Sequence, residues 1–380
     1  MIKALQLGQA RWSGVGLIAA TYLYFLIFAQ FGFLHRVRES LGQEYWNVVL
    51  GVMGLAGILG ALFTWMRYRS GAGRAWLTVS FVGAGGGAFL AGIGLHLSVF
   101  VLSAFISGFF LSTLTVSLIA VLAEMLPLKE AGLVCGLGTG VAYFLSNVPV
   151  LFEASPLFQC LAAVLACLFG VVCAMQVPVG ALVSTAEARR SMAPERRASA
   201  VESNALRYAL PGWILIFMIL VWSDSAAFTR IQETPELKAA SWSGAGNLWS
   251  IGIVHLVAAI FAGYLLDSGR FKWLFLLAFA GLLLGWLGLE HAFAGVLPAC
   301  VYAAAVSFYS TALVGFALVR SRGLSPVLLA AGVFGVSGWV GSAMGIGMVN
   351  DLGRLPLGFW AVAVVFLVLG IFLTERKVAQ

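Results

Sequence analysis

Charged residues are scarce in this chain, because Asp, Glu, Lys and Arg together make up only 10% of its 380 residues. Hydrophobic residues make up 61%, and the mean hydropathy is +1.00. Soluble domains contain about 25% charged residues, which keep their surface hydrated. The composition therefore excludes an ordinary soluble domain and predicts a protein whose outer surface contacts lipid.

Sequence signatures of catalysis and of bound cofactors are also absent. The chain has no GxSxG nucleophile elbow, no HExxH zinc motif and no Walker-type phosphate loop. Its five cysteines form no CxxC pair and fall inside apolar segments, where a thiol is usually an inert small hydrophobe. We therefore expect no enzyme activity, no disulfide framework, no resident metal and no cofactor.

Long apolar runs fill most of the sequence. A helix that crosses a bilayer needs about 20 predominantly apolar residues, and continuous runs are typical of helices rather than of barrel strands. The sequence predicts an all-α membrane protein with twelve transmembrane helices near residues 14–34, 46–66, 75–95, 97–123, 131–152, 156–177, 209–229, 244–266, 273–290, 293–319, 325–349 and 355–374.

An internal repeat divides these helices into two sets. Residues 29–40 align with residues 223–234, so that Gln30 corresponds to Asp224. The repeat also pairs Arg36 with Arg230, Glu39 with Glu233, and Ser112-Thr113 with Ser310-Thr311. Duplication in a chain this apolar predicts two pseudo-symmetric six-helix bundles with a solute site between them.

The two bundles are expected at residues 1–182 and 209–380. Residues 183–208 are rich in Ala, Ser, Arg and Glu and lack apolar periodicity, so they are expected to be a linker, with a short surface helix as an option. Of the 22 Lys and Arg residues, the side opposite the linker holds only Arg36, Arg38, Arg230, Lys238 and Arg354.

This asymmetry decides the expected topology. The positive-inside rule assigns the linker and both termini to the cytoplasm. The net charge of +7 therefore indicates membrane orientation and not a nucleic-acid partner. We expect a monomeric integral protein of a bacterial inner membrane, surrounded by the lipid bilayer.

One loop carries a motif. It runs from Gly263 to Lys272 and contains Asp267, Gly269 and Arg270. This loop resembles the signature that recurs between the second and third helices of each half in the major facilitator superfamily. The equivalent first-half loop keeps Gly60, Arg67, Arg69 and Arg74 but has Thr64 where the family has an aspartate. The resemblance implies a secondary transporter that works by alternating access.

The same loop is a candidate gate. The Asp267 carboxylate can approach the positive N-terminus of the helix that starts near residue 131, in the other bundle. Arg270 and Arg74 can pair across this seam, or they can serve only the positive-inside rule. Because Thr64 replaces the acid in the first copy, a symmetric pair of latches is not expected.

Asp224 is the main candidate for coupling. It lies well inside the predicted span 209–229, and an acid within the bilayer is a functional hypothesis by default. It can bind a proton or another coupling ion, or it can be a structural acid held by a neighbouring basic or polar residue. Its repeat partner Gln30 cannot titrate, so coupling is expected in one half only.

Arg36 and Arg230 allow two interpretations. As equivalent residues facing each other across a cleft they could clamp a carboxylate or phosphate, because guanidinium groups match these anions. They could instead pair with Glu39 and Glu233, three residues further on, as the ion pairs of an outer gate.

The resemblance implies a central cavity lined chiefly by the first, fourth, seventh and tenth spans, with contributions from four others. Aromatic and amide side chains there suit a small polar organic solute, an anion included. The candidate substrate-binding residues are Tyr22, Gln30, Arg36, Thr113, Tyr143, Asn147, Trp222, Arg230, Asn247, His255, Tyr309, Thr311 and Trp339.

Two other functions stay open. Met344, Met348 and His255 are soft ligands that suit copper, so a copper importer is an alternative. A non-transporting membrane protein with an assembly or sensing role is the other. The Gly-Pro pair that marks drug/proton antiporters of the family is missing from residues 131–149, which disfavours that class.

Overall fold

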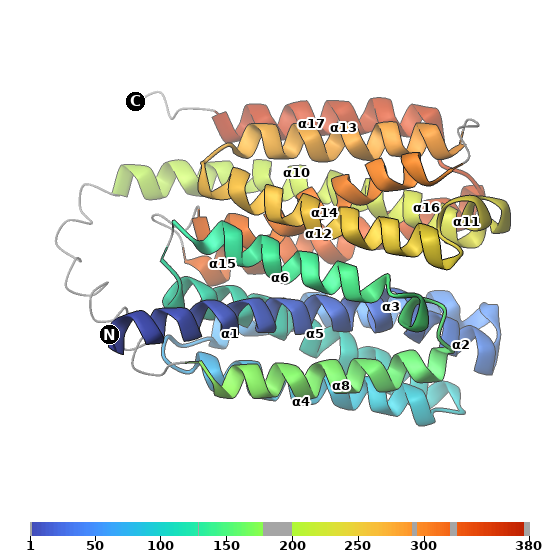
Figure 1. Ribbon diagram of the computed structural model, residues 1–380, viewed down its shortest axis with the longest axis horizontal. Helices are drawn as coiled ribbons and strands as arrows, with labels where there is room; N and C mark the ends of the chain where they lie inside the picture. Colours follow the sequence, from blue (N-terminus) through green and yellow to red (C-terminus); the bar gives the residue numbers. More distant parts are fainter. Residues whose placement is uncertain (1, 128, 178–199, 291–294, 320–324, 376–380) are drawn as a thin grey trace.

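The computed structural model describes residues 2–127, 129–177, 200–290, 295–319 and 325–375. Within these ranges the chain forms helices and no strand. The long helices run alongside one another (Figure 1). The start of α1 (Ile2–Tyr24) and the end of α17 (Leu357–Glu375) lie at one end, the termini end. The opposite end carries α2 (Phe33–Leu41) and α11 (Pro235–Ser241), and we name it the α2/α11 end.

The elements up to residue 175 gather in the lower half of Figure 1, and those from residue 200 gather in the upper half. The lower set continues from α1 with η1 (Phe25–Gly32), α2, η2 (Gln43–Tyr45), α3 (Trp46–Arg67), α4 (Gly73–Ile93), α5 (Leu97–Met125), α6 (Ala131–Ser146), α7 (Pro149–Phe152) and α8 (Pro156–Met175). The upper set comprises α10 (Ala200–Glu233), α11, α12 (Ala245–Asp267), α13 (Phe271–Glu290), α14 (Val296–Val319), α15 (Pro326–Gly332), η4 (Val333–Gly338), α16 (Trp339–Leu352) and α17.

Eleven helical segments in the described part of the chain are long and apolar enough to cross a membrane, and α6 is a shorter apolar helix. Large apolar side chains such as Leu59, Leu165 and Val365 are exposed on the outside of the bundle. In water this exposure would be unfavourable, whereas in a bilayer these side chains contact lipid. The predicted all-α membrane fold is confirmed.

The predicted helix 131–152 is wrong in its length. Helix α6 ends at Ser146, and the short α7 starts afresh at Pro149. Proline has no N–H to donate and biases the preceding residue toward extended backbone. Val148 accordingly has φ −64° and ψ 126°. This break leaves the Asn147 side chain free to turn toward the neighbouring helices.

The last residues of the predicted linker are helical. Helix α10 already begins at Ala200, so residues 200–208 belong to the helix that forms the seventh span. Residues 183–199 of the predicted linker lie outside the described residues. At its other end α10 extends to Glu233, beyond the predicted end of this span at residue 229, and Pro235 starts α11.

Glycines bring α6 of the lower half against α12 of the upper half. A Cβ at Gly132 would meet the Gly263 carbonyl oxygen, and a Cβ at Gly136 would meet the Ala259 carbonyl oxygen. Only glycine allows backbones to approach so closely. In α16, Gly341 and Gly345 pack instead against α10, within the upper half.

Candidate functional site

A cavity of about 570 Å³ lies between the two halves. Residues of α1, η1, α3 and α5 line one side, and residues of α10, α14, η4 and α16 line the other. Asn47 and Asn350, near its rim at the α2/α11 end, are exposed. Ser112, Tyr309 and Ser310 lie at its inner limit. The volume is in the range of ligand pockets for small organic molecules.

Asp224 of α10 lies on the wall of this cavity and is only 6% exposed. The hydroxyl groups of Tyr302 and Tyr309, both on α14, donate hydrogen bonds to its two carboxylate oxygens. Among the described residues no Lys or Arg forms a salt bridge with it. The structure thus holds a buried acid with polar partners and no cationic one.

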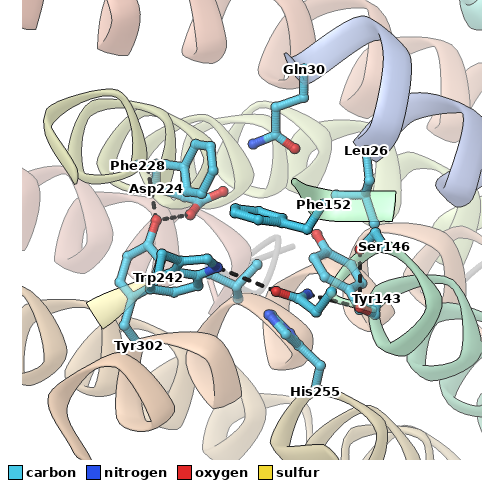
Figure 2. A pocket seen from close by; sticks show the side chains of 12 residues that line it. Leu26, Gln30, Tyr143, Ser146, Phe152, Asp224, Phe228, Trp242, His255 and Tyr302 are labelled. Carbon is cyan, nitrogen blue, oxygen red and sulfur yellow. Dashed lines mark hydrogen bonds between the residues drawn. The ribbon is translucent and has the colours of Figure 1, made fainter. Parts of the chain in front are cut away.

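A second pocket, of about 30 Å³, adjoins the first at Asp224 and Tyr143 (Figure 2). It is large enough for water. Gln30 and Asp224, which the repeat pairs, face it together. Trp242 Nε1 donates to Asn147 Oδ1 at 3.3 Å, and the Tyr302 hydroxyl binds Asp224 at the same pocket.

His255 also lines this small pocket and is buried. The Ser307 hydroxyl donates to the His255 carbonyl oxygen at 3.1 Å, and Ser307 Oγ lies 2.8 Å from His255 Nδ1. Because the single hydroxyl proton of Ser307 is donated to the carbonyl oxygen, Oγ can only accept from His255, so Nδ1 carries the imidazole proton and Nε2 is an acceptor. Tyr143 stacks on the imidazole with ring centroids 4.5 Å apart, which fixes the ring orientation.

The equivalent serines Ser112 and Ser310 each bind an aromatic side chain of the opposite half. Trp339 Nε1 donates to Ser112 Oγ at 2.5 Å, and the Tyr143 hydroxyl lies 2.8 Å from Ser310 Oγ. Tyr22 adds a 2.8 Å bond from its hydroxyl to the Ser310 carbonyl. These bonds join the halves at the inner limit of the cavity.

The structure brings most of the expected cavity residues together. Those that line one or both pockets are Tyr22, Gln30, Tyr143, Asn147, Asp224, His255, Tyr309 and Trp339. Thr113 and Thr311 are buried away from the pockets, and Asn247 lies outside the lining. Trp222 instead packs its ring against Phe359 of α17, with centroids 5.2 Å apart.

Arg36 and Arg230, for which an anion clamp was one of two interpretations, each contact groups of their own half. Arg36 binds Glu39 at 3.1 Å and the Gly92 carbonyl at 3.4 Å, all within the lower half. Arg230 lies 3.9 Å from Glu290 of α13. Neither arginine lines the cavity, because each is held by groups of its own half.

The gate between Arg230 and Glu233 is absent as well. Glu233 pairs with Arg38 instead, at 3.4 Å, and this bridge crosses between α10 and α2. Of the expected ion pairs at this end, only Arg36 with Glu39 forms. The cross-half partner of Glu233 is a residue that the sequence interpretation did not consider.

At the termini end the last residue of α12, Asp267, contacts α6. The Asp267 carboxylate accepts hydrogen bonds from the backbone N–H groups of Gly132 at 2.7 Å and Leu133 at 2.8 Å. These are free donors of the first turn of α6, where an anion is favourable. Arg74 and Arg270 are exposed, and in the described part of the chain neither forms a salt bridge.

The first-half equivalent of Asp267 makes no such contact. Thr64 is fully buried and donates its hydroxyl back to the Gly60 carbonyl at 2.7 Å. The neighbouring Tyr68 instead donates to Glu124 at 3.5 Å. Burial and the adjacent Glu124 carboxylate raise the pKa of Tyr68, so this phenol stays protonated as a donor. The loops after α3 and α12 therefore differ, because Asp267 contacts the other half whereas Thr64 bonds within its own helix.

No family model and no curated protein matches the sequence. Solved structures do match. The chain is similar to the proton:xylose symporter XylE of the major facilitator superfamily, solved bound to 6-bromo-6-deoxy-D-glucose. The TM-score is 0.67, the sequence identity is 13%, and the match covers 98% of this chain and 95% of the other. The fold is that of the major facilitator superfamily.

Within this major facilitator fold, sequence reasoning missed Tyr302 and Trp242. Tyr302 precedes Tyr309 by two helical turns, so both hydroxyls reach the same face of α14. That spacing was a usable signal for the second tyrosine. Trp242 follows the short helix α11, and nothing in the sequence indicated that its indole would reach Asn147.

The major facilitator fold also separates the proposed copper ligands. His255 lines the small pocket, whereas Met344 lines the large cavity and Met348 lines neither. The described residues contain no group of three or more His, Cys, Asp or Glu side chains positioned to hold a metal ion.

Proposed function

We propose that this protein is a proton-coupled secondary transporter that moves a small organic solute through the cavity between its halves by alternating access. The observation that supports this most directly is Asp224, a carboxylate buried in the cavity wall to which no cationic side chain of the described residues is paired. Keeping such a charge inside a bilayer is costly, and a structural role alone does not require it to face a cavity.

The two ends of the molecule support a cycle. The cavity is accessible at the α2/α11 end, while the Asp267 contact with α6 closes the termini end. The distribution of Lys and Arg supports a cytoplasmic termini end. In this proposal the structure corresponds to an outward-facing state, and breaking the Asp267 contact leads to the inward-facing one.

Proton coupling follows from the position of Asp224. A proton that binds its carboxylate neutralises the buried charge and weakens the need for the Tyr302 and Tyr309 donors. The protonated and ionised forms therefore favour different arrangements of α10 and α14. Such a difference is what allows a proton gradient to drive a conformational change.

The two alternatives have less support. Copper import requires His255 and the methionines to share a site, and they line different pockets or none. A non-transporting role leaves both the open cavity and the buried acid without a purpose.

The test is solute movement into liposomes that contain the purified full-length chain. D-xylose, benzyltrimethylammonium and benzenesulfonate serve as a neutral, a cationic and an anionic probe, and their uptake or release is measured with and without an imposed pH gradient. We expect at least one probe to move faster with the gradient. The Asp224→Asn variant keeps the side-chain shape but cannot titrate, and it should lose the acceleration.

Glu236→Gln is the matched control, because it removes one acid from exposed α11 outside the cavity. It should behave as the wild type. Uptake that stays equally gradient-dependent in Asp224→Asn would remove the coupling role from Asp224. If the wild-type chain moves none of the three probes, the transporter proposal fails.

A further inference from the structure

The cavity between the two halves has a lining of one charge sign. Its acidic members are Asp224 and Glu233. Among the described lining residues, His35 is the one whose side chain can carry a positive charge. Over the residues that the structure describes, no Lys or Arg lines either the cavity or the adjoining small pocket. An anionic solute would therefore enter a site with carboxylates and no fixed positive charge.

Three arginines near the rim are already engaged, and Lys238 of α11 is not among the residues that line either pocket. Arg36 is held by Glu39 and by the Gly92 carbonyl, and Arg230 pairs with Glu290 outside the cavity. Arg38 pairs with Glu233, which compensates the charge of that acid. Asp224 is consequently the one cavity acid without a guanidinium partner in the described part of the chain.

Aromatic rings surround this acid. Tyr302 and Tyr309 bind its carboxylate, Phe228 lies one helical turn further along α10, and Tyr143 and Trp242 complete the wall across the small pocket. The faces of such rings attract cations, with about 0.5–2 kcal/mol for each good contact. A buried carboxylate within aromatic walls is a favourable environment for an ammonium group attached to apolar carbon.

Two polar groups on the lining have no partner. Trp46 Nε1 is a buried donor without an acceptor, and Gln232 has both side-chain amide atoms unpaired. Buried polar groups are normally satisfied, so these groups are available to a solute or to water. A hydroxyl or carbonyl on the solute could bind them while its cationic group lies at Asp224.

We infer that the cavity binds an organic cation, an ammonium compound with an apolar or aromatic body, and that Asp224 is the countercharge that recognises it. This inference deepens the proposed transport function and rests on it for the direction of movement. The solute and the proton then compete for one carboxylate, which makes exchange of cation for proton the expected coupling. The missing Gly-Pro pair in α6 concerns helix flexibility and not the charge of the cavity.

Binding to the purified full-length chain in lipid nanodiscs tests the charge preference. The probes are benzyltrimethylammonium, benzyl alcohol and benzenesulfonate, which share a ring and differ in charge. Quenching of tryptophan fluorescence reports binding, because Trp46, Trp242 and Trp339 line the pockets. We expect the cation to bind about tenfold more tightly than the alcohol, and the sulfonate more weakly than both.

Asp224→Asn should reduce the preference for the cation over the alcohol to about threefold or less, while the alcohol binds as before. Glu236→Gln, an exposed acid of α11, should keep the full preference. A second measurement needs no variant. Binding of the quaternary cation should weaken as pH falls, since protonation of Asp224 removes its charge.

Other titratable groups face the same space. His35 on α2 and Glu233 on α10 line the large cavity, and His255 on α12 lines the small pocket. Any change of charge at these groups remains in the Asp224→Asn variant. Tyr143, Tyr302 and Tyr309 stay neutral over that range. The pH effect assigned to Asp224 is therefore the part that disappears in Asp224→Asn, and a pH response of undiminished size in that variant would overturn the assignment.

Equal binding of all three probes, tighter binding of the sulfonate, or no binding of the cation overturns the substrate class. The failure of the transport proposal is distinguishable. If the cation binds through Asp224 but never crosses the liposome membrane, the proposed cation site is supported and the proposed transport function is contradicted. If D-xylose or benzenesulfonate moves and the cation does not, the transporter stands and the substrate class is wrong.

Discussion

The Asp267 carboxylate accepts a hydrogen bond from the Gly132 backbone N–H at 2.7 Å, and this contact joins the two halves at the termini end. The neighbouring Leu133 N–H binds the second oxygen at 2.8 Å. An aspartate at this point combines hydrogen bonding with the favourable charge of a helix N-terminus. Asparagine has the same size, but one of its terminal atoms is a donor and would face an N–H group.

We therefore predict that Asp267→Asn opens the termini end more often. The loss of one charge-assisted bond, about 1.5–3 kcal/mol, corresponds to a shift of roughly tenfold or more in the equilibrium. Cys135 of α6 is a native reporter, because it is fully buried between α6 and α14 near Gly315. Its labelling by a maleimide, read by peptide mass spectrometry, should accelerate in the variant.

Cys167 provides the internal control for this experiment. It is buried between α8 and α4, where a Cβ at Gly85 would lie 3.1 Å from it, so it sits within one half. Rocking of the halves leaves its surroundings intact. Faster labelling of both thiols would indicate general unfolding, and unchanged labelling of Cys135 would contradict the latch.

The close approach of α6 and α12 gives a second prediction. Alanine is a better helix former than glycine by about 0.5–1 kcal/mol. A Gly→Ala substitution in a helix should therefore not destabilise the protein where there is room for the methyl group. At Gly136 the new methyl group would meet the Ala259 carbonyl and push the helices apart. We predict a lower apparent Tm in detergent for Gly136→Ala.

Gly86 of α4 is the matched position, because a Cβ there meets no atom within 4 Å. Gly86→Ala should leave the apparent Tm unchanged or raise it slightly. Equal effects at the two glycines would mean that the crossing of α6 and α12 tolerates a methyl group, against the packing described above.

Much of the architecture could be predicted from composition. The apolar runs and the repeat predict the helices, and the Gly263–Lys272 loop predicts which segment Asp267 can reach. The polarity of Asp224 within a span predicts a special environment, which the structure shows to be two tyrosine hydroxyls. Such features depend on one segment at a time, and a sequence displays them directly.

Which residues of a helix face the cavity was harder to predict. Successive residues of a helix point about 100° apart. A small error in the predicted orientation of a helix therefore assigns a side chain to the cavity when it lies in the packing interface, or the reverse. Ser112 and Ser310 reach aromatic partners, whereas Thr113 and Thr311, one position on, are buried away from the pockets. Trp222, two positions before Asp224, points to α17.

Ion pairs depend on distant residues and were predicted least well. Arg230 has an acid three residues ahead, yet it lies 3.9 Å from Glu290 of α13. Glu233 forms its ion pair with Arg38 of the other half. Nothing in the local sequence ranks these partners, because surface ion pairs differ by only about 1 kcal/mol.

The cross-half bonds of Ser112 and Ser310 can be tested with a double-mutant cycle. Ser112→Ala leaves the indole N–H of Trp339 without an acceptor, at a cost of about 1–3 kcal/mol. Trp339→Phe removes the unpaired donor as well. The double variant should therefore lose less apparent Tm than the sum of the two single changes.

The equivalent cycle with Ser310→Ala and Tyr143→Phe should show coupling of the same sign, because the Tyr143 hydroxyl meets Ser310 Oγ in the other half. Strict additivity in both cycles would show that these bonds contribute nothing to holding the halves together. Coupling in only one cycle would indicate that the two contacts, equivalent in the repeat, differ in strength.

The tyrosine hydroxyls at Asp224 predict a pH-dependent stability. Tyr302→Phe removes one donor from the carboxylate, and an ionised carboxylate needs these donors more than a protonated one does. Destabilisation by Tyr302→Phe should therefore be larger at about pH 8 than at about pH 5, where protonation of Asp224 is favoured. Apparent Tm in detergent, compared with wild type at each pH, measures the difference.

The Asp224→Asn background separates this effect from other titrations. With no carboxylate at position 224, the cost of Tyr302→Phe should lose its pH dependence, although His255 still lines the same pocket. Tyr264→Phe, at an exposed tyrosine of α12, should cost little at either pH. A cost of Tyr302→Phe that is larger at low pH would mean that the Tyr302 hydroxyl oxygen accepts a hydrogen bond from the protonated Asp224 carboxyl group, the reverse of the donor role assigned to it.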